Sequence, residues 1–543
     1  MQFGQMMEQP LLISDLICHA ERYHGDSEIV SRQVDGSLHR YTWADAARRA
    51  RQLANALTAL GIKEGDCVGT LAWNTHRHLE AYYAISGIGA ICHTVNHRLF
   101  TDQILYIINH AEDRVLLFDA TFLSMVEQLA PGLPQVRAYV LMGSREQMPA
   151  ESPLDNLLCY EDLVGSHSDV LDWPALDERM ASSLCYTSGT TGNPKGVLYS
   201  HRSTVLHAFS SSLPDALHIS AEASVLPVVP MFHVNGWGLP YSAAMNGAKL
   251  VLPGPKMDPI SLYQLIEEEQ VTMAAGVPTV WLALMQHCEV NRLRLHALKR
   301  LIVGGSAVPE AMIEQLAEHG VEVRQLWGMT ELSPCGTTST PKFKHRDVDA
   351  RTRRLLGTAQ GRPLFGVRMR IVDGNGQALP QDGVAFGNLQ VRGPWVLAQY
   401  FRCGPDGAHT ADGWFNTGDV ARIDADGYMH ITDRTKDVIK SGGEWISSIE
   451  LENIIIGHPA VAEAAAVGIP HPKWDERPVL VVVLKPGASV SRDELLRFYD
   501  GKIAKWWTPD DVLFVDELPH TATGKLQKMK LRERLREYRW PDA

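Results

Sequence analysis

The chain has 543 residues, a length that predicts more than one structural unit. It is 45% hydrophobic and 21% charged, and its formal net charge of −12 argues against a nucleic-acid-binding protein, whose domains usually carry a positive surplus. No stretch reaches the roughly 18 uncharged apolar residues of a membrane helix, and no basic segment typical of a signal peptide opens the chain.

The eight cysteines are scattered and form no C-x-x-C pair, so neither a zinc site nor a thioredoxin-like site is expected. Such cysteines fit a reducing compartment, where most are plain buried residues. Together with the lack of a transmembrane segment, they predict a cytoplasmic protein.

The first half of the chain alternates between helical and extended patterns. Residues 42–60 predict a helix capped by Thr42, because apolar residues recur every three or four positions and Gly61 follows. Strands are then predicted at 66–73, 91–95 and 114–119, helices at 78–90 and 101–111, and a similar alternation returns over 248–320. This alternation predicts a largely parallel sheet that helices cover on both faces.

The pattern changes from about residue 360. Residues 367–393 read as strand, turn and strand with N-G and D-G turn signals, which predicts a small antiparallel β unit. Helices and strands return after residue 445, in enough chain for a domain of about 100 residues. We predict an N-terminal domain over 1–432, a hinge at 433–436 and a C-terminal domain over 437–543.

A glycine-rich stretch, YTSGTTGNPKG at 186–196, follows a short apolar segment. It differs from the common nucleotide-binding loop, because Gly196 rather than Ser or Thr follows Lys195. Glycines let a backbone approach an oxyanion closely, and the lysine adds a positive charge. Taken alone, the stretch fits a surface hairpin turn equally well.

Four further motifs accompany this loop: WGMTELSP at 327–334, GWFNTGD at 413–419, DRTKDVIKSGGEWIS at 433–447 and LPHTATGK at 518–525. In this order, the five motifs resemble those of the adenylate-forming superfamily of acyl-CoA synthetases, luciferases and peptide-synthetase adenylation domains. The resemblance implies an α/β fold: a large N-terminal domain of doubly covered mixed sheets with a small β unit, and a separate small α+β C-terminal domain.

The resemblance also implies a binding site for ATP. The glycine loop would hold the β- and γ-phosphates through Thr187, Ser188, Gly189, Thr190, Thr191, Gly192 and Lys195. The remaining nucleotide contacts would come from Gly304, Gly305, Ser306, Trp327, Gly328, Met329, Asp419, Arg434 and Trp445. Asp419 and Arg434 would bind the ribose, Trp445 would stack on the adenine, and Lys436 would stand at the hinge.

Three residues would carry the chemistry by the same resemblance. Thr330 offers a hydroxyl to the α-phosphate, and Glu331 offers a hard oxygen for Mg²⁺. Lys525 would bridge the substrate carboxylate and the α-phosphate, where negative charge gathers. Outside such a set, a carboxylate is more often a solvated or capping group and a lysine is more often a surface residue.

An acyl pocket is implied around His233, Trp237, Gly304 and Pro334. His233 would lie near the substrate carboxylate and is counted among the catalytic residues, although a single histidine beside apolar residues is more often part of a core. Trp237 occupies the position at which some fatty acyl-CoA synthetases have an indole that gates the acyl tunnel. Packing in the core is the equally weighted alternative for Trp237.

The predicted function is that of an ATP-dependent acyl-CoA ligase that uses ATP, Mg²⁺ and coenzyme A. Strings such as PVVPMFHVNGWG and KSGGEWISSIELEN resemble bacterial medium- and long-chain fatty acyl-CoA synthetases. We favour a medium-chain acid and then a long-chain acid, and the alternative is a short thioether acid such as 3-methylthiopropionate. Chain length depends on pocket shape, which motifs do not report.

Two other functions stay open. The chain could be a non-catalytic AMP-binding protein, although none of the motif residues is replaced. It could also be an acyl-AMP ligase that loads a carrier protein, although no insertion follows the TGD motif. No nucleic-acid partner is expected, and a homodimer is left open.

Overall fold

The computed structural model describes residues 2–187, 193–404, 407–442, 444–520 and 526–540. They form two compact units. The first unit comprises Met1–Arg368 and Arg392–Asp406, and the second comprises Met369–Val391 and Gly407–Ala543.

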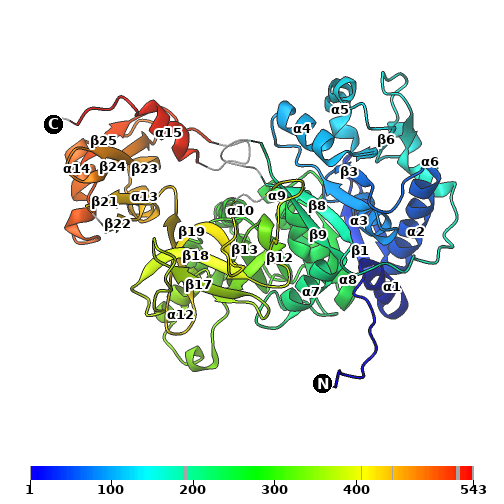
Figure 1. Cartoon of the computed structure of the whole chain (residues 1–543), viewed down its shortest axis with the longest axis horizontal. Helices are drawn as coiled ribbons and strands as arrows, with labels where there is room; N and C mark the ends of the chain where they lie inside the picture. The colour runs from blue at the N-terminus through cyan, green and yellow to red at the C-terminus, as the bar shows by residue number, and fades with distance from the viewer. Residues whose placement is uncertain (1, 188–192, 405–406, 443, 521–525, 541–543) are drawn as a thin grey trace. The chain divides into compact units, whose positions relative to one another are not determined.

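A seven-stranded sheet lies in the first unit, with the strand order β7-β6-β5-β3-β4-β8-β9. Its neighbours are parallel except for β9, which pairs antiparallel with β8. Figure 1 labels β3, β6, β8 and β9 of this sheet. Its strands are β3 (Cys67–Leu71), β4 (Ile91–Thr94), β5 (Val115–Phe118), β6 (Ala138–Leu141), β7 (Leu157–Cys159), β8 (Ala181–Tyr186) and β9 (Gly196–Ser200).

A nine-stranded sheet completes the first unit, in the order β16-β15-β14-β13-β12-β10-β11-β1-β2. Its centre is parallel, while β2, β15 and β16 pair antiparallel at the edges. Its strands are β1 (Glu28–Arg32), β2 (Leu38–Thr42), β10 (Ser224–Pro227), β11 (Lys249–Leu252), β12 (Met273–Gly276), β13 (Arg300–Gly304), β14 (Glu322–Gly328), β15 (Cys335–Thr338) and β16 (Arg362–Pro363).

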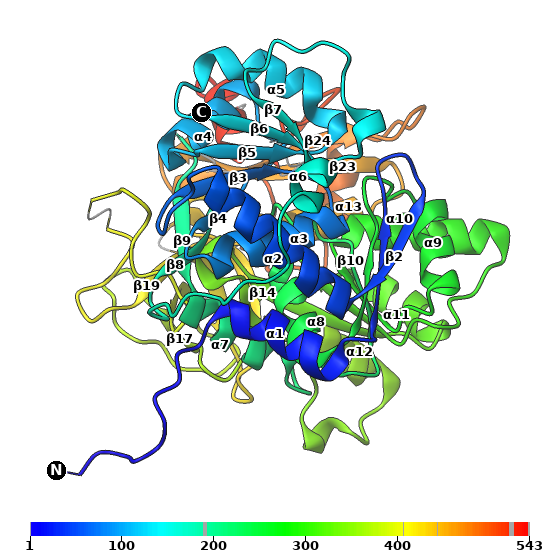
Figure 2. The same cartoon turned by 90° about the vertical axis from the view of Figure 1, so that its right-hand side faces the viewer.

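Helix α3 (His76–Gly87) lies between the two sheets, and all of its residues are buried. It contacts β1 of the nine-stranded sheet and β3, β4 and β8 of the seven-stranded sheet, with α2 alongside (Figure 2). The hydroxyl of Tyr82 donates to the carbonyl of Met231, and that of Tyr83 donates to the carbonyl of Pro240 at 2.9 Å. The two sheets therefore share one central helix, as a doubly covered α/β arrangement predicts.

The other helices of the first unit cover the outer faces of the sheets or close its ends. Residues of α9, α10 and α11 share one hydrophobic core with the nine-stranded sheet, and residues of α4 and α5 share another with the seven-stranded sheet. These helices are α1 (Ile13–His24), α2 (Trp43–Ala59), α4 (Thr101–Ala111), α5 (Leu123–Leu129), α6 (Tyr160–Gly165), α7 (His201–Ser212), α8 (Leu239–Asn246), α9 (Pro259–Glu268), α10 (Pro278–Asn291), α11 (Glu310–Glu318) and α12 (Ala350–Thr358).

Two helices show how far local sequence determines the fold. The expected cap of α2 is present: the Thr42 hydroxyl accepts from the Asp45 backbone N–H, and the Asp45 carboxylate accepts from that of Thr42. Helix α7 was not predicted. Its buried face includes histidine, threonine and serine, and an exposed position is Phe209, so the sequence carries no one-sided apolar pattern for a periodicity argument to find.

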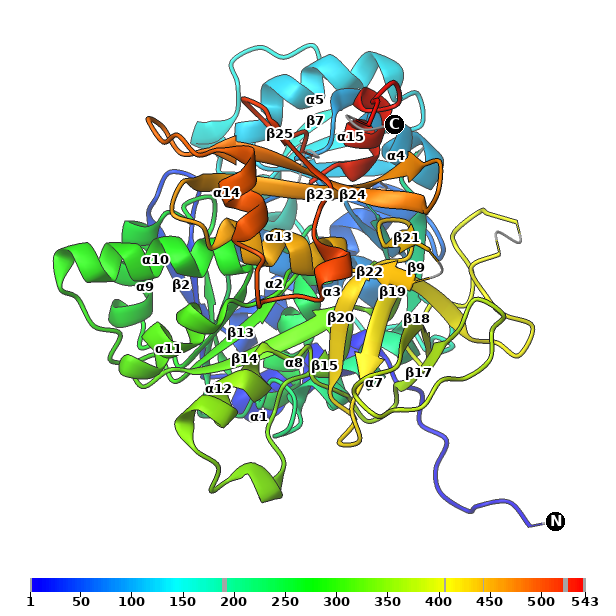
Figure 3. The same ribbon diagram turned by 90° about the vertical axis from the view of Figure 1, so that its left-hand side faces the viewer.

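The second unit contains two sheets (Figure 3). A four-stranded sheet has the order β17-β18-β19-β20, and a second sheet runs β22-β21-β24-β23 with β25 paired to β24. The strands are β17 (Arg368–Val372), β18 (Phe386–Arg392), β19 (Phe415–Ile423), β20 (Met429–Arg434), β21 (Ile439–Ser441), β22 (Glu444–Ile446), β23 (Val461–His471), β24 (Asp475–Leu484) and β25 (Asp511–Phe514), with helices α13 (Ser448–Ile456), α14 (Arg492–Arg497) and α15 (Lys528–Arg534).

The division into units differs from the predicted domains in one respect. The four-stranded sheet was expected to belong to the N-terminal domain, but its strands group with the C-terminal chain. A hinge at 433–436 lies inside the second unit by this division and stays a prediction. Among the described helices, none combines the length and the apolar character needed to cross a membrane.

Candidate active site

The glycine loop is closed at its base by backbone pairing between β8 and β9. The Thr187 N–H donates to the Lys195 carbonyl at 2.9 Å, and the Lys195 N–H donates to the Thr187 hydroxyl at 3.3 Å. The Phe401 N–H donates to the Gly196 carbonyl at 2.8 Å, which fixes the far side of the base. Five predicted phosphate ligands, Ser188, Gly189, Thr190, Thr191 and Gly192, lie outside the described residues.

The phosphate and magnesium motif forms a short 3₁₀ turn, η5 (Thr330–Leu332), directly after β14. The Tyr199 hydroxyl on β9 donates to the Thr330 carbonyl at 2.6 Å. The Leu397 N–H donates to the Glu331 carbonyl at 2.8 Å. The strand that leaves the glycine loop therefore holds the turn that carries Thr330 and Glu331.

Tyr400 connects Lys195 with Glu331. Its hydroxyl donates to Glu331 Oε1 at 2.6 Å, and the Lys195 ammonium lies 4.5 Å from the centre of its ring. Glu331 is buried, at 7% exposure, whereas Lys195 is exposed. A cation over an aromatic face and a charge-assisted hydrogen bond both restrain these side chains. Three residues far apart in the chain thus form one connected group.

Two glycines of the predicted site have structural reasons for lacking a side chain. A Cβ atom at Gly328 would lie 1.9 Å from the carbonyl oxygen of Pro334, so the backbone approach there requires glycine. A Cβ atom at Gly304 would lie 2.9 Å from Cη2 of Trp237. The indole of Trp237 therefore packs directly against the Gly304 backbone.

Trp237 belongs to η4 (Val234–Gly238), where Asn235, Gly236 and Trp237 have positive φ. Trp237 is buried, at 4% exposure. The side chain of Asn235 accepts from the Cys185 thiol at 2.8 Å and donates to the Ser183 hydroxyl, which ties η4 to β8. These contacts hold the indole in place beside β13. Such a position suits both alternatives for Trp237, a gate of the acyl tunnel and a core residue.

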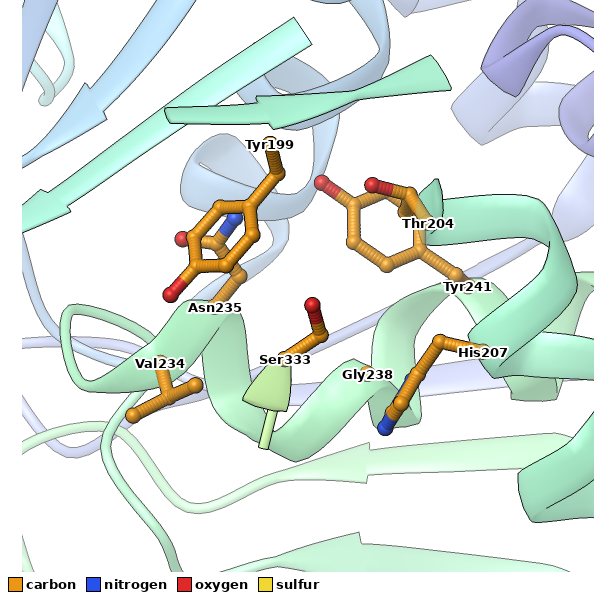
Figure 4. Close-up of a pocket in the computed structure, with 8 residues that line it drawn as sticks. All are labelled: Tyr199, Thr204, His207, Val234, Asn235, Gly238, Tyr241 and Ser333. Carbon is orange, nitrogen blue, oxygen red and sulfur yellow. The ribbon is translucent and has the colours of Figure 1, made fainter. Parts of the chain in front are cut away.

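A small cavity of about 10 Å³ lies among β9, α7, η4 and α8, and this volume is about that of one water molecule. Figure 4 shows the Tyr241 and Ser333 hydroxyls directed toward the space between the Tyr199 and Tyr241 rings. The lining comes from β9, α7, η4, α8 and the residue before Pro334: Tyr199, Thr204, His207, Val234, Asn235, Gly238, Tyr241 and Ser333. Gly238 follows Trp237 and Ser333 precedes Pro334 along the chain, but Trp237 and Pro334 are not among the lining residues.

The other predicted residues of the first unit have mixed exposure. Pro334 and Trp327 are buried, and Met329 is half-buried. His233, Gly305 and Ser306 are exposed at the ends of their elements. An exposed His233 is not the core histidine that was the alternative to a role in the pocket.

The second unit carries the predicted ribose ligands. Asp419 on β19 and Arg434 on β20 face each other across the strand pair, and Arg434 Nη1 lies 2.8 Å from Asp419 Oδ1. The Asp419 side chain is 5% exposed and the Arg434 side chain is 47% exposed. A fixed carboxylate of this kind can accept from two hydroxyls.

The remaining predicted residues of this unit surround the hinge segment. Lys436 is exposed by surface area, but partial desolvation of its ammonium lowers its pKa, while Asp437 opposes the shift. Trp445 on β22 packs near Phe386, with 6.1 Å between ring centres. Lys525 lies outside the described residues, and an isolated bridge pairs His520 with Leu526 on either side of that segment.

A buried group of charges near the hinge was missed by the sequence analysis. Lys528 Nζ lies 2.7 Å from Glu452 Oε1 and donates to the Ser448 hydroxyl at 2.6 Å. The Ser448 N–H donates to the Asp433 carboxylate at 2.5 Å. Lys528 and Glu452 have side-chain exposures of 8% and 12%. This group joins the end of β20 to α13 and α15, close to the segment that carries Lys525.

The residues present fit the predicted magnesium site. Glu331 supplies a carboxylate, and Mg²⁺ usually takes one or two protein carboxylates together with water and substrate phosphates. No cluster of three His, Cys, Asp or Glu residues suited to a metal occurs in the part of the chain that the structure describes. A magnesium ion would therefore depend on the phosphates of the nucleotide as well as on Glu331.

Tyr199, Tyr400 and His207 also escaped the sequence analysis. Each acts through a contact between distant parts of the chain: Tyr199 with Thr330, Tyr400 with Glu331, and His207 with Cys335. No short spacing marks such pairs. The sequence of β9 has no polar–apolar alternation to point Tyr199 inward, because the exposed Leu198 before it is itself apolar.

The fold and the five motifs are those of an adenylate-forming enzyme, and the chain belongs to the AMP-binding enzyme family. The family model described as AMP-binding enzyme matches residues 18–401, and the one described as AMP-binding enzyme C-terminal domain matches residues 450–525. The assignment that the five motifs suggested is thereby confirmed.

Several characterised relatives span nearly the whole chain. It is 54% identical to the 3-methylmercaptopropionyl-CoA ligase of Ruegeria lacuscaerulensis, with coverage of 98% of this chain and 99% of that protein. It is 52% identical to the medium-chain-fatty-acid–CoA ligase of Ectopseudomonas oleovorans, with 98% and 97% coverage. The long-chain-fatty-acid–CoA ligase of Thermus thermophilus is 47% identical, with 98% and 97% coverage.

Solved structures confirm the fold. The anthranilate CoA ligase AuaEII in complex with anthranoyl-AMP has a TM-score of 0.84 at 26% identity, covering 98% of each chain. ATP-bound MatB from Rhodopseudomonas palustris has a TM-score of 0.81 at 26% identity, covering 96% of this chain and 99% of that one.

Proposed function

We propose that the chain is an ATP-dependent acyl-CoA ligase that activates a short aliphatic acid. In the first step a carboxylate oxygen attacks the α-phosphorus of ATP, the bond to the β-phosphate oxygen breaks, and pyrophosphate leaves. In the second step the sulfur of coenzyme A attacks the acyl carbon, its proton goes to solvent, and AMP leaves. Full-length identity of 47% or more to three CoA ligases with different acids supports this reaction class.

The residues of the first unit suit the first step. Catalysis of phosphoryl transfer depends mainly on positioning and on neutralising charge. The Tyr199 hydroxyl holds the backbone at Thr330, and the Tyr400 hydroxyl holds the carboxylate of Glu331. Thr330 would donate to the α-phosphate, and Glu331 would hold Mg²⁺, which neutralises phosphate charge. Lys195 would add a further positive charge near the phosphates.

The residues of the second unit suit nucleotide binding and the change between steps. Asp419, fixed by Arg434, would accept from the ribose hydroxyls. Lys436 would be the hinge that lets one site meet ATP first and coenzyme A later. We place the enzyme in the cytoplasm, because all eight cysteines are free.

The packing of Trp237 carries the choice of acid. Its indole is buried, at 4% exposure, and lies directly against Gly304 in the predicted acyl pocket. An indole in this place leaves room for a short acid, whereas a medium-chain tail needs the indole to move. This packing favours an acid of the size of 3-methylthiopropionate over the medium-chain acid that the sequence suggested. A medium-chain acid remains the second candidate, because the relative with that specificity is 52% identical.

A panel of straight-chain acids from C3 to C18, with thioether and aromatic acids, tests the proposal through AMP release with and without coenzyme A. We expect the highest kcat/KM at or below about five chain atoms. Trp237→Ala should move the optimum to longer acids, with a gain that grows by about fourfold for each methylene newly accommodated. Trp73→Ala, a partly buried tryptophan outside the cavity, is the matched control.

The outcomes separate the alternatives. A medium-chain optimum in the unaltered enzyme would replace the short acid with the second candidate. An even loss of activity on all acids in Trp237→Ala, with a lowered melting temperature, would identify Trp237 as a packing residue. AMP binding with no AMP release from any acid would point to the non-catalytic alternative.

A further inference from the structure

We propose that His110 is a positioning residue for ATP, which fixes the base of the glycine loop through the hydroxyl of Tyr186. The inference rests on the proposed acyl-CoA ligase function and deepens it. His110 lies on α4, 76 residues before Tyr186 along the chain, and none of the five motifs contains it. Its role follows from four sets of contacts.

The first set links Tyr186 to both ends of the loop. Tyr186 is the last residue of β8, and it pairs across the strands with Gly196, the first residue of β9. Thr187 and Lys195, whose backbones are hydrogen-bonded to each other, are the next residues toward the loop. A Cβ atom at Gly196 would lie 3.3 Å from Cε1 of Tyr186, so the ring lies closely against the Gly196 backbone. The place of this ring therefore affects both strands where the loop begins and ends.

The second set concerns the Tyr186 hydroxyl, which needs a partner because the residue is only 8% exposed. Nδ1 of His110 lies 2.7 Å from the hydroxyl oxygen. Among the residues that the structure describes, no other group bonds to this hydroxyl. A buried hydroxyl has lost its hydrogen bonds to water, so it is strongly held to the one partner that replaces them. His110 thereby determines where the far end of the Tyr186 ring lies.

The third set holds His110 itself in place. Its ring stacks on Tyr106, one turn earlier in α4, with 5.3 Å between ring centres and 19° between ring planes. Its ring also meets that of Phe401 edge to face, at 5.6 Å and 89°. The His110 carbonyl accepts from Arg402 Nη1 at 2.9 Å, and Arg402 pairs with Glu112 at 2.7 Å. The imidazole is therefore a fixed point to which the Tyr186 hydroxyl is bound.

The fourth set joins His110 to the other strand of the loop base. Phe401, whose ring His110 contacts, donates its N–H to the Gly196 carbonyl at 2.8 Å. His110 thus acts on β8 through Tyr186 and on β9 through Phe401. Lys195 directly precedes Gly196, so the place of its ammonium depends on the same base. Because phosphoryl transfer depends mainly on positioning and charge neutralisation, a displaced Lys195 should weaken the binding of ATP.

His110 acts through its hydrogen bond and not through a charge. Burial lowers the pKa of its imidazole, and Arg402 and His93 lower it further, while Glu112 opposes the shift. The ring is therefore mainly neutral near pH 7. An asparagine at this position can place an amide atom where Nδ1 lies, and an amide can bond to a phenol as a neutral imidazole does. Asparagine cannot reproduce the stacking on Tyr106, so it separates the hydrogen bond from ring packing.

Calorimetric titration with magnesium–ATP tests the proposal, because it needs neither an acid nor turnover. Tyr186→Phe and His110→Leu should each raise the Kd for ATP by about tenfold, since each removes the hydrogen bond. The double variant should bind no more weakly than either single variant, because both changes remove the same interaction. His110→Asn should bring the Kd back to within about threefold of that of the unaltered protein.

Two controls separate positioning from general stability. Tyr139→Phe changes another buried tyrosine of the seven-stranded sheet, on β6, with β5, β3 and β4 between it and β8. It should leave the Kd for ATP unchanged. The KM for the carboxylic acid, measured in the same variants through AMP release, should also stay unchanged in Tyr186→Phe, because the loop base contacts the nucleotide and not the acid.

An unchanged Kd for ATP in both Tyr186→Phe and His110→Leu would overturn the proposal, even if both variants had lower melting temperatures, because the pair would then only stabilise the fold. Additive losses in the double variant would overturn the shared hydrogen bond as the cause. Failure of the unaltered protein to release AMP with any acid is a different result. It would reject the proposed ligase function, whereas the calorimetric comparison would still decide whether His110 positions the loop for ATP.

Discussion

The two units hold their predicted site residues by different means. In the first unit, tyrosine hydroxyls position Thr330 and Glu331, and Lys195 interacts with a ring face. In the second unit, an ion pair between Arg434 and Asp419 at 2.8 Å joins two predicted site residues. A further pair, Lys528 with Glu452 at 2.7 Å, lies near the predicted hinge and was not predicted. Hydrogen bonds from rigid aromatic side chains fix a geometry, whereas a buried ion pair makes local structure depend on every charge being present.

The largest effect is expected from removing the buried charge of Lys528, which tests whether the second unit depends on its ion pairs. Lys528→Met should lower the free energy of unfolding of the second unit by about 3–5 kcal/mol, because Glu452 is left buried without its partner. Urea unfolding followed by tryptophan fluorescence measures this. Lys530→Met, the same substitution at an exposed position of α15, should change stability by less than about 0.5 kcal/mol. Equal effects from both variants would contradict the role of the ion pair.

Lys525→Ala tests whether the second unit supplies the charge at the reacting carboxylate. We expect adenylate formation to fall by at least about 100-fold, because the variant removes the cation placed between the carboxylate and the α-phosphate. Thioester formation from preformed acyl-AMP should be far less affected. Rates of the two half-reactions, measured separately, check this, and normal adenylation by the variant would reject the role of Lys525.

The Lys528→Met defect should also depend on pH. Burial raises the pKa of the Glu452 carboxyl, and Lys528 opposes the rise, so losing the lysine raises that pKa further. A folded-state pKa above the unfolded value means that stability falls as pH rises from about 4.3 towards the folded value. The difference in stability between the unaltered protein and the variant should therefore be greater at pH 8 than at pH 5. A difference that is the same at both pH values would show that Glu452 is not the unpaired charge.

Tyr400→Phe probes the hydroxyl-based arrangement of the first unit. Loss of the hydrogen bond to Glu331 should lower kcat/KM for adenylation by about tenfold and raise the Mg²⁺ concentration needed for half-maximal rate. The thioester step should change less. Tyr23→Phe, at a tyrosine that is 64% exposed on α1, serves as the control. If the Mg²⁺ concentration needed for half-maximal rate is unchanged in Tyr400→Phe, Tyr400 does not position the carboxylate that binds Mg²⁺.

Sequence reasoning succeeded where the signal was local or borne by a motif. The cap of α2 depends on two residues three apart, Thr42 and Asp45, so the sequence displays it directly. The roles of Thr330, Glu331 and Asp419 come from short strings with a fixed order and stay predictions, whereas the family that these strings indicated is confirmed. The fold class follows from alternating helical and extended patterns, and it is confirmed by solved structures of similar fold.

Sequence reasoning failed where the cause is tertiary. The buried face of helix α7 carries polar as well as apolar residues, so the sequence shows no apolar stripe, and neither the helix nor His207 on it was found. The partners of Tyr199 and Tyr400 are 131 and 69 residues away along the chain. Lys528 was passed over because a lysine is normally exposed, and only the packing of α13 against it reveals the exception.

The position of α3 limits how the first unit could be divided. A fragment that ends after β9 would keep the helix and the seven-stranded sheet but lose Met231, Pro240 and Tyr241. The hydroxyls of Tyr82 and Tyr83 would then lose their acceptors, and the face of α3 that they share would meet water. Neither sheet is therefore expected to fold without the other. A gene split or permuted between them would separate two halves of one hydrophobic core and not two domains joined by a linker.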